Sequence, residues 1–372
     1  MKPVYTDLHI HTSKNADELS VKYDCKTLIE KLKEFSKAER IMISLTDHNV
    51  INRCAYEEIV NNHNEIDLIV GVELHISNYS ECDPYHCHMY FNIEKNEILC
   101  KIDKINLILK TLYPRKMIEK GNEVPTLEEL AKEFDEYEYL LLPHGGQSHR
   151  TFDKSIPEEI KFDTVMERNI YFNQFDGFTS RSNKRLERTK NYFNRLGISS
   201  FINLITCSDN YEPSVYPQTK SDIKEDFVPT WMLAEPTFSG LRLSLSESTR
   251  LVYKKDKPIF NKDYIKSVKL NNDLIDIDVN LTEGLNVVIG ESSSGKTLFM
   301  DSLYKKLKDL LPNEDNIYNK YKVENLKVDN PVGFKPHYIH QNYITKVIDE
   351  KYDEGIDKID ILKTTFGDAE EL

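Results

Sequence analysis

Histidine and carboxylate residues recur in short motifs through the first two thirds of the chain. Nine of the 11 histidines precede residue 150. The motifs, in chain order, are Asp7-Leu8-His9-Ile10-His11, Asp47-His48, Gly71-Val72-Glu73, His86-Cys87-His88, Pro143-His144-Gly145-Gly146 and Ser208-Asp209. Imidazole and carboxylate groups together suit Zn, Mn or Fe better than Ca or Mg. The residue types therefore indicate a metal centre of that class.

Short apolar runs precede most of these motifs. The runs are Val4–Thr6, Ile41–Leu45, Leu68–Val70, Leu140–Leu142 and Phe201–Ile205. Runs of this length with β-branched residues are typical of buried strands. Because side chains on a strand alternate between its faces, Asp7, His9 and His11 would point to one side. A lone His-x-His pair is more often an exposed or hydrogen-bonded pair, but its recurrence with the other motifs after apolar runs favours metal binding.

Helical stretches separate the apolar runs, for example Lys26–Lys37 and Leu127–Phe134. The second opens with Pro125-Thr126-Leu127-Glu128-Glu129, the pattern of a capped helix start. Alternation of strand and helix predicts an α/β fold with a parallel sheet, and a length of about 240 residues favours a closed β/α barrel. In such barrels the chemistry lies at the carboxyl ends of the strands, where these histidines and carboxylates fall.

Six motifs, in this order, resemble those of the PHP-domain metal phosphoesterases: DLHIHTS, SLTDHN, GVELHI, HCHMYF, LLPHGG and TCSDN. The resemblance covers roughly residues 3–245 and implies a distorted β/α barrel with two or three metals at its mouth. It implies the following ligands: His9, His11, Glu73 and Asp209 for one metal, Glu73, His88 and His144 for a second, and Asp17 and His48 for a third, with Asp47 nearby. His86 is the alternative to His88.

One motif departs from the family pattern. Where the family has Ser-Asp-x-His, this chain has Ser208-Asp209-Asn210-Tyr211, so a third-site histidine is replaced by Tyr211. The resemblance therefore implies two metals more firmly than three. Two divalent ions about 4 Å apart would clamp a phosphoryl group and lower the pKa of a bound water, which attacks phosphorus as hydroxide. Asp47 or His48 would be the catalytic group that handles the proton.

A basic stretch, Arg181–Arg195, carries six Lys and Arg residues and one Glu in an otherwise acidic chain. Its apolar residues fall on one face of a predicted helix. The helix is either a solvated face of the barrel or a guide for a phosphate backbone. In the second case the candidate substrate contacts are His149, Arg150, Arg185 and Arg188. His63 and His75 are expected to be ordinary residues, and the six cysteines inert thiols.

A phosphate-binding loop is predicted at Gly290–Thr297, whose sequence GESSSGKT matches GxxxxGK[ST]. It follows a predicted strand, Leu285–Ile289, and opens a helical stretch, Leu298–Leu311. The cofactor would be ATP with Mg, bound by Gly290, Ser294, Gly295, Lys296 and Thr297. The stretch GLNVVIGESSSGKT resembles the start of an ABC- or SMC-type ATPase head, and Tyr338–Gln341 resembles its Q-loop, in which Gln341 would sense Mg and the γ-phosphate.

The composition of the chain argues against several classes of protein. The chain has 372 residues and a formal net charge of −13, which argues against a module that wraps nucleic acid by charge alone. No apolar run approaches the roughly 20 residues that span a bilayer, and the start lacks a signal-peptide core. A cytoplasmic chain without membrane contact is expected. The predicted domains are a PHP domain at residues 1–250, a linker at 251–263 and a partial ATPase head at 264–372.

The predicted ATPase head lacks a signature motif and a Walker B carboxylate pair. We therefore expect a longer chain or a second subunit to supply the rest, with oligomerisation through the ATPase. The combination, with the junction at residues 235–242 (EPTFSGLR), resembles the PHP–ATPase family of the TrlF type. The resemblance implies a nuclease acting on DNA or RNA, regulated by the ATPase and serving defence or repair. The alternatives are a small-molecule phosphomonoesterase and a non-catalytic metal-containing binding module.

Overall fold

The computed structural model of the chain divides into two compact units, residues 1–258 and 259–372. The first unit includes part of the segment predicted as a linker, because Leu251–Tyr253 pairs as a strand within it. The residues that the structure describes are 2–19, 23–77, 83–119, 122–145, 174–180, 203–222, 226–258, 264–282, 285–309, 321–331, 333, 335–336 and 338–339.

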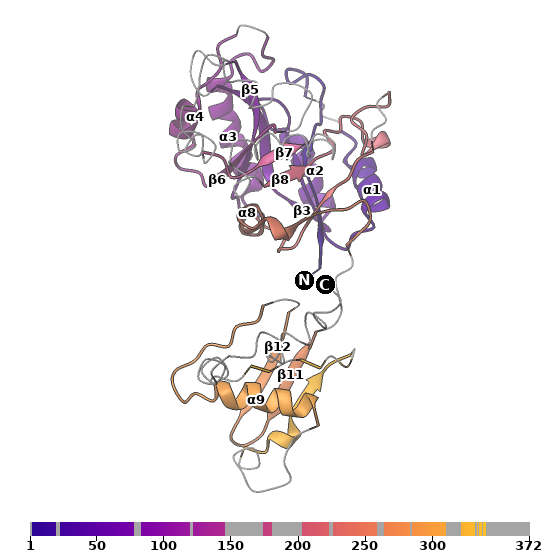
Figure 1. The fold of residues 1–372 in the computed structure, drawn as a ribbon. Coiled ribbons are helices and arrows are strands. Elements are labelled where there is room, and N and C mark those ends of the chain that lie inside the picture. Colours follow the sequence, from indigo (N-terminus) through magenta and orange to yellow (C-terminus); the bar gives the residue numbers. More distant parts are fainter. Residues whose placement is uncertain are drawn as a thin grey trace, which may run out of the picture. The chain divides into compact units, whose positions relative to one another are not determined.

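The described residues of the first unit form three sheets (Figure 1). One sheet has the order β10-β9-β1-β2-β3, formed by β10 (Leu251–Tyr253), β9 (Thr230–Met232), β1 (Val4–Ile10), β2 (Ile41–Leu45) and β3 (Ile66–Leu68). The second is antiparallel and consists of β4 (Val70–Ile76), β5 (Tyr85–Phe91) and β6 (Tyr139–Pro143). The third is a parallel pair, β7 (Phe178–Ser180) and β8 (Leu204–Thr206).

The prediction of a parallel sheet is correct only in part. β1, β2 and β3 run parallel, as do β7 and β8, but β4, β5 and β6 form an antiparallel meander, and β9 is antiparallel to β1 and β10. The connection between β4 and β5 is too short for the crossover helix that a parallel pair requires. The first unit is therefore a mixed α/β fold.

Three isolated bridges join the sheets into a ring. His48 pairs with Glu73, His144 with Thr179, and Ile10 with Asn210. These bridges connect the end of β2 to β4, the end of β6 to β7, and the segment after β8 back to β1. The strands of the first unit thus form a barrel-like arrangement that is interrupted at three places.

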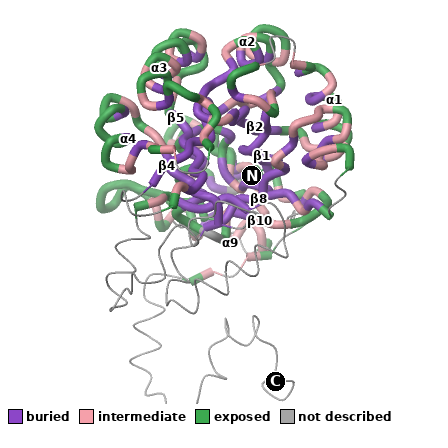
Figure 2. The backbone as a smooth tube through the Cα atoms, turned by 90° about the horizontal axis from the view of Figure 1, so that it is seen from above, coloured by how far each residue is buried: buried purple, intermediate pink, exposed green. Residues whose placement is uncertain are grey.

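Helices lie outside this ring, and Figure 2 shows buried strands surrounded by an arc of α1 to α4. The helices are α1 (Cys25–Ser36), α2 (Arg53–Asn62), α3 (Ile98–Leu112), α4 (Leu127–Glu133) and α8 (Phe238–Ser246). The predicted capped start is confirmed at α4, where Thr126 Oγ1 accepts from the N–H of Glu129 and the Glu129 carboxylate accepts from the N–H of Thr126. None of the described helices is both long and apolar enough to cross a membrane.

The second unit has a small antiparallel sheet, β12-β11-β13, and one longer helix. Its elements are β11 (Ser267–Asn271), β12 (Asp276–Asn280), α9 (Lys296–Leu307) and β13 (Lys327–Asp329). Val268 and Leu270 of β11 form a core with Leu303 of α9. The predicted strand Leu285–Ile289 is wrong: the segment has irregular backbone and its residues are exposed. A strand forms only with a neighbour to pair with, and none of the described strands pairs with this segment.

Candidate metal centre

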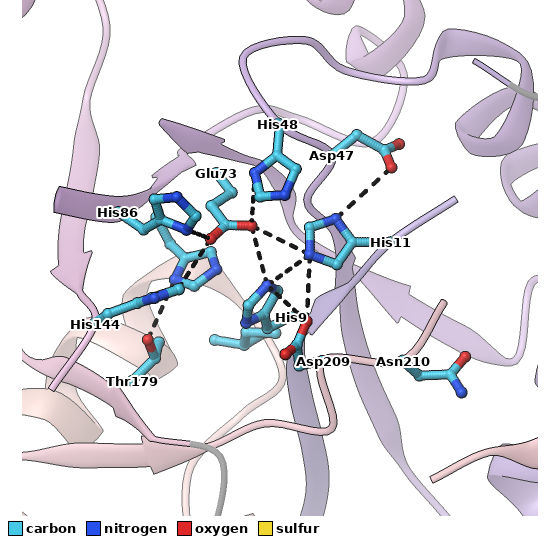
Figure 3. Close-up of polar contacts among 12 residues, drawn as sticks. His9, His11, Asp47, His48, Glu73, His86, His144, Thr179, Asp209 and Asn210 are labelled. Atoms are coloured by element: carbon cyan, nitrogen blue, oxygen red, sulfur yellow. Dashed lines mark hydrogen bonds and ion pairs between the residues drawn. The ribbon is translucent and has the colours of Figure 1, made fainter. Parts of the chain in front are cut away.

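The bridges that close the ring lie among buried polar side chains. His48, Glu73 and His144 are bridge residues. Asp209 follows β8, and its backbone N–H donates to the carbonyl of His9 at 2.9 Å. Backbone pairing therefore brings the ends of four strands, and the side chains that follow them, to one place in the first unit (Figure 3).

Glu73 lies at the middle of this cluster and is 1% exposed. Its Oε2 atom faces three imidazoles, at 3.2 Å from His9 Nε2, 3.1 Å from His11 Nε2 and 3.1 Å from His48 Nδ1. Its Oε1 atom faces two others, at 3.0 Å from His144 Nε2 and 2.5 Å from His86 Nδ1. The two oxygens of one carboxylate thus serve two different sets of histidines, as in a bridging ligand.

The possible ligand atoms form overlapping groups. Within each group these atoms lie within 4.8 Å of one another, and the groups are His9, Glu73, His88 and His144; His9, His11 and Asp209; His11, His48 and Glu73; and His48, His75 and His86. The first two groups contain the predicted ligands of the first two metals. His88 lies in the first group with Glu73 and His144, and His86, its alternative, lies in the group with His48 and His75.

Burial and charge set the protonation of these groups. Burial lowers the pKa of His48 to about 4 and lowers the pKa of His88 and His144 as well. Burial alone would raise the pKa of Glu73, but the surrounding histidines, His48 foremost, hold it well below its usual value. His11 is the exception: burial opposes its charge, yet Asp209 and Glu73 raise its pKa to about 10. Neutral imidazoles keep a lone pair for a metal.

The surroundings of His88 indicate whether a metal could bind beside its ring. Its Nδ1 lies 3.3 Å from the hydroxyl of Thr179, whereas its Nε2 is buried and has no hydrogen-bond partner in the described part of the chain. A buried polar atom without a partner is unfavourable by about 1–3 kcal/mol. With the proton on Nδ1, the Nε2 lone pair is available to a metal in the group with Glu73 and His144. The donor set therefore fits a divalent cation. Nothing in the sequence around Thr179 singled it out as a partner of His88.

Asp47, predicted as a catalytic group, is occupied by backbone contacts. Its Oδ1 accepts from the N–H groups of Thr12 at 2.7 Å and Ser13 at 3.0 Å, and its Oδ2 accepts from the Thr12 hydroxyl at 2.5 Å. Oδ1 also lies 3.9 Å from His11 Nδ1. Asp47 is 1% exposed, and burial raises its pKa. Its contacts hold the turn after β1 and support the His11 ring.

The predicted third set is not assembled. Asp17 is exposed, its backbone N–H donates to the Asn15 side chain, and it belongs to none of the ligand groups found among the described residues. Tyr211 stacks on His11, with ring centroids 4.1 Å apart and planes 15° apart. The tyrosine ring therefore covers one face of a predicted ligand, and His48 lies with Glu73 and not with Asp17.

His75, which was expected to be an ordinary residue, lies among the possible ligands. It is 5% exposed and forms a group with His48 and His86. Glu73 and His75 occupy the same face of β4, and the register places Glu73 opposite His88 and His75 opposite His86. This shared parity was the signal in the sequence. For His63 the same expectation stays a prediction, and this residue belongs to none of the groups found among the described residues.

The predicted phosphate loop, Gly290–Thr297, lies in the second unit. α9 begins at Lys296, and Gly295 before it has a φ of +90°, a conformation that favours glycine. A Cβ on Gly290 would lie 2.5 Å from Ser294 Oγ, so the Ser294 side chain would have to move to make room for one. Lys296 Nζ donates to the carbonyls of Gly290 and Glu291, at 2.7 Å each. Thr297 follows as the second residue of the helix.

Several predicted residues lie outside the described part of the chain. They are His149, Arg150, Arg185, Arg188 and Gln341. Their roles in binding substrate or nucleotide stay predictions.

A scan against models of protein families finds no match, and a search of curated proteins finds none either. Among solved structures, the chain is similar to a protein from Bifidobacterium adolescentis named as an inferred metal-dependent phosphoesterase, at 12% identity and a TM-score of 0.36, over 64% of this chain and 94% of that one. It is also similar to an amidohydrolase from Chromobacterium violaceum with bound sulfate and no metal, at 14% identity and a TM-score of 0.36, over 67% of this chain and 98% of that one. At these TM-scores neither likeness bears on the function of this chain.

Proposed function

We propose that the first unit is a metal-dependent phosphoesterase. The observation that carries the proposal is the Glu73 carboxylate, whose two oxygens face different sets of buried imidazoles. One metal would be held by His9, His11, Glu73 and Asp209, and a second by Glu73, His88 and His144. When bound, two divalent ions supply a clamp for a phosphoryl group and lower the pKa of a water so that it can act as nucleophile.

The remaining residues of the centre position these ligands or contact solvent. Asp47 holds the turn at Thr12 and supports His11, and the Thr179 hydroxyl orients His88. We assign proton transfer to His48 and not to Asp47. The His48 side chain is 17% exposed, whereas the side chain of Asp47 is 1% exposed. A group that exchanges a proton with substrate or water must reach them.

We further propose that the substrate is nucleic acid. The same chain carries a phosphate loop, which is expected to bind ATP, and its sequence carries the basic stretch Arg181–Arg195. Arg185 and Arg188, with His149 and Arg150, are the proposed contacts to the phosphate backbone. A small phosphomonoester is the alternative substrate. Replacing Arg185 and Arg188 by Glu should weaken substrate binding without loss of metal if the nucleic-acid proposal is correct.

The second unit is proposed to be part of an ATPase head that regulates the phosphoesterase. In support, the segment before the phosphate loop exposes apolar side chains, with Leu285 88%, Val287 69% and Ile289 89% exposed. Exposed apolar side chains grouped in one short segment are typical of a surface that another element covers. The proposed cover is the rest of the head, from a longer chain or a second subunit, with assembly of two or more copies.

The test combines metal analysis with hydrolysis assays. Metal content is measured by mass spectrometry on wild type and on His9→Ala/His11→Ala, and both are assayed with Mn²⁺ on DNA, RNA and a chromogenic phosphomonoester. Two or more metals per chain, with nucleic-acid cleavage that the double variant loses, would support the whole proposal. Cleavage of the monoester alone would indicate that the substrate is a small phosphomonoester and not nucleic acid. Bound metal without any hydrolysis would leave a binding module, and no metal at all would refute the phosphoesterase.

A further inference from the structure

Two buried histidines, His75 and His86, lie beside the metal centre but are not among its proposed ligands. They face each other across β4 and β5. Their Nε2 atoms lie 2.9 Å apart, and the other ring nitrogen of His86, Nδ1, lies 2.5 Å from Glu73 Oε1. The three side chains therefore form a continuous row that ends on the bridging carboxylate.

The Asn49 side chain sets the direction of the hydrogen bonds in this row. Asn49 Oδ1 accepts from the backbone N–H of His75 at 3.0 Å, and Asn49 Nδ2 donates to the carbonyl of Lys116 at 2.7 Å. A backbone N–H only donates and a carbonyl only accepts, so these contacts fix which end of the amide is nitrogen. The same Nδ2 lies 3.1 Å from His75 Nδ1. His75 Nδ1 must therefore accept, and the ring carries its proton on Nε2.

The other contacts then follow in one direction. His75 Nε2–H donates to His86 Nε2, so His86 carries its proton on Nδ1, the nitrogen that lies 2.5 Å from Glu73 Oε1. A proton on both nitrogens of His86 would place two N–H groups face to face across 2.9 Å. Asn49 itself is held firmly: it is 1% exposed, and its backbone N–H donates to the carbonyl of Glu73 at 2.8 Å.

We propose that Asn49, His75 and His86 form a hydrogen-bond chain that orients the Glu73 carboxylate, and that neither histidine is a metal ligand. They are positioning residues, and the inference rests on the metal centre of the proposed function. Hydrogen bonds to a ligating carboxylate typically raise metal affinity by 10–100-fold.

The competing arrangement is a further metal on His48, His75 and His86, whose ligand atoms lie within 4.8 Å of one another. A metal on His75 Nε2 would require the ring proton on Nδ1. That proton would face the N–H of Asn49, which the backbone contacts hold in place. The surroundings of His75 thus favour a donor over a ligand.

Nuclear magnetic resonance of the wild-type chain with isotope-labelled histidine tests the proposal directly. In protein loaded with an NMR-active cadmium isotope, His88 and His144 should show nitrogen–cadmium coupling. His75 and His86 should show none, with His75 protonated on Nε2 and His86 on Nδ1. Cadmium coupling to either of these two, or the opposite tautomers, would overturn the chain. Should no cadmium bind, the proposed function fails, and the two tautomers in metal-free protein still decide the chain.

Asn49→Asp distinguishes the two arrangements by the sign of its effect. A carboxylate at this position accepts from His75 Nδ1–H, which reverses the chain and leaves Glu73 without its donor. We expect metal affinity to fall by about 10–100-fold with the number of metals unchanged. If His75 were a ligand, the same carboxylate would support it and metal would bind more tightly, which would overturn the proposal. Asn106→Asp is the matched control, since Asn106 also spans a backbone N–H and a carbonyl, both of Ile51, at 2.9 Å each. Where Asn49→Asp does not fold, the wild-type spectra give the decision.

Discussion

Phosphate chemistry is proposed for both the metal centre of the first unit and the predicted phosphate loop of the second, but the side chains of these two regions differ greatly in burial and in contacts. Glu73 is 1% exposed and its two oxygens face five imidazoles. Residues 285–295, by contrast, are all exposed, and Lys296 Nζ contacts the carbonyls of its own loop. Buried polar groups need hydrogen-bond or ion-pair partners within the fold, whereas exposed polar groups can bond to water and stay accessible to a ligand. The first unit thus contains a preassembled cluster of polar side chains, whereas the predicted phosphate loop of the second unit is exposed.

The largest effect is expected from Glu73→Gln, which replaces the proposed ligand that both metals share. An amide carries no charge and cannot bridge two cations as a carboxylate does. We expect loss of bound metal and a fall in hydrolysis of about a thousandfold, because several kcal/mol of transition-state stabilisation depend on the metals. Metal analysis and initial rates measure both. Glu58→Gln, at an exposed position of α2, is the control. A variant with full metal content would show that Glu73 is not the bridge.

Asp47→Asn tests the support of the centre. The amide has one oxygen, so it cannot accept from the two backbone N–H groups and also from the Thr12 hydroxyl as the carboxylate does. The free energy of unfolding should therefore fall by about 1–3 kcal/mol. Metal affinity should fall by about 10–100-fold, because the His11 ring loses a neighbour that positions it. Denaturant unfolding and metal titration measure the two quantities.

Asp17→Asn is the comparison for Asp47, since the sequence predicted Asp17 as a ligand and the structure leaves it exposed. It should leave metal content at the wild-type value and change stability by less than about 0.5 kcal/mol. Loss of one metal in Asp17→Asn would restore the third site that the sequence implied.

The sequence predicts some features of the metal centre and of the fold around it, but not others. Residue type and strand parity predicted a cluster of imidazoles and carboxylates at the strand ends, and the structure brings these side chains together. The assignment of ligands to each metal came from the resemblance to the PHP-domain family and stays a prediction. The antiparallel pairing of β4 with β5 could not be derived in the same way, and it is this register that places His75 opposite His86. The contact of Thr179 with His88 could not be predicted either, because a single hydroxyl residue on a three-residue strand belongs to no recognisable sequence pattern. Its role arises only when β7 lies beside His144.

Lys296→Ala tests the loop that a ligand is expected to complete. In the presence of ATP at about 100 times its dissociation constant, binding stabilises a protein by about 2.7 kcal/mol, and this gain should vanish in the variant. Thermal unfolding with and without ATP and Mg²⁺ measures it. Metal content of the first unit should stay at the wild-type value. Lys327→Ala, at an exposed position of β13, is the control. If ATP and Mg²⁺ raised the unfolding temperature of Lys296→Ala as much as that of wild type, the nucleotide would bind at a site other than this loop.

Ile289→Ala should have the smallest effect on the chain by itself. With 89% of the residue exposed, little apolar surface leaves water when the chain folds, so the free energy of unfolding should change by less than about 0.5 kcal/mol. Leu270→Ala, 3% exposed in the core of the same unit, should lower it by about 2–5 kcal/mol. Denaturant unfolding of the two variants places them on one scale. A loss at Ile289 as large as that at Leu270 would show that the segment before the phosphate loop already packs within this chain, and the proposed need for the rest of an ATPase head would lose its structural support.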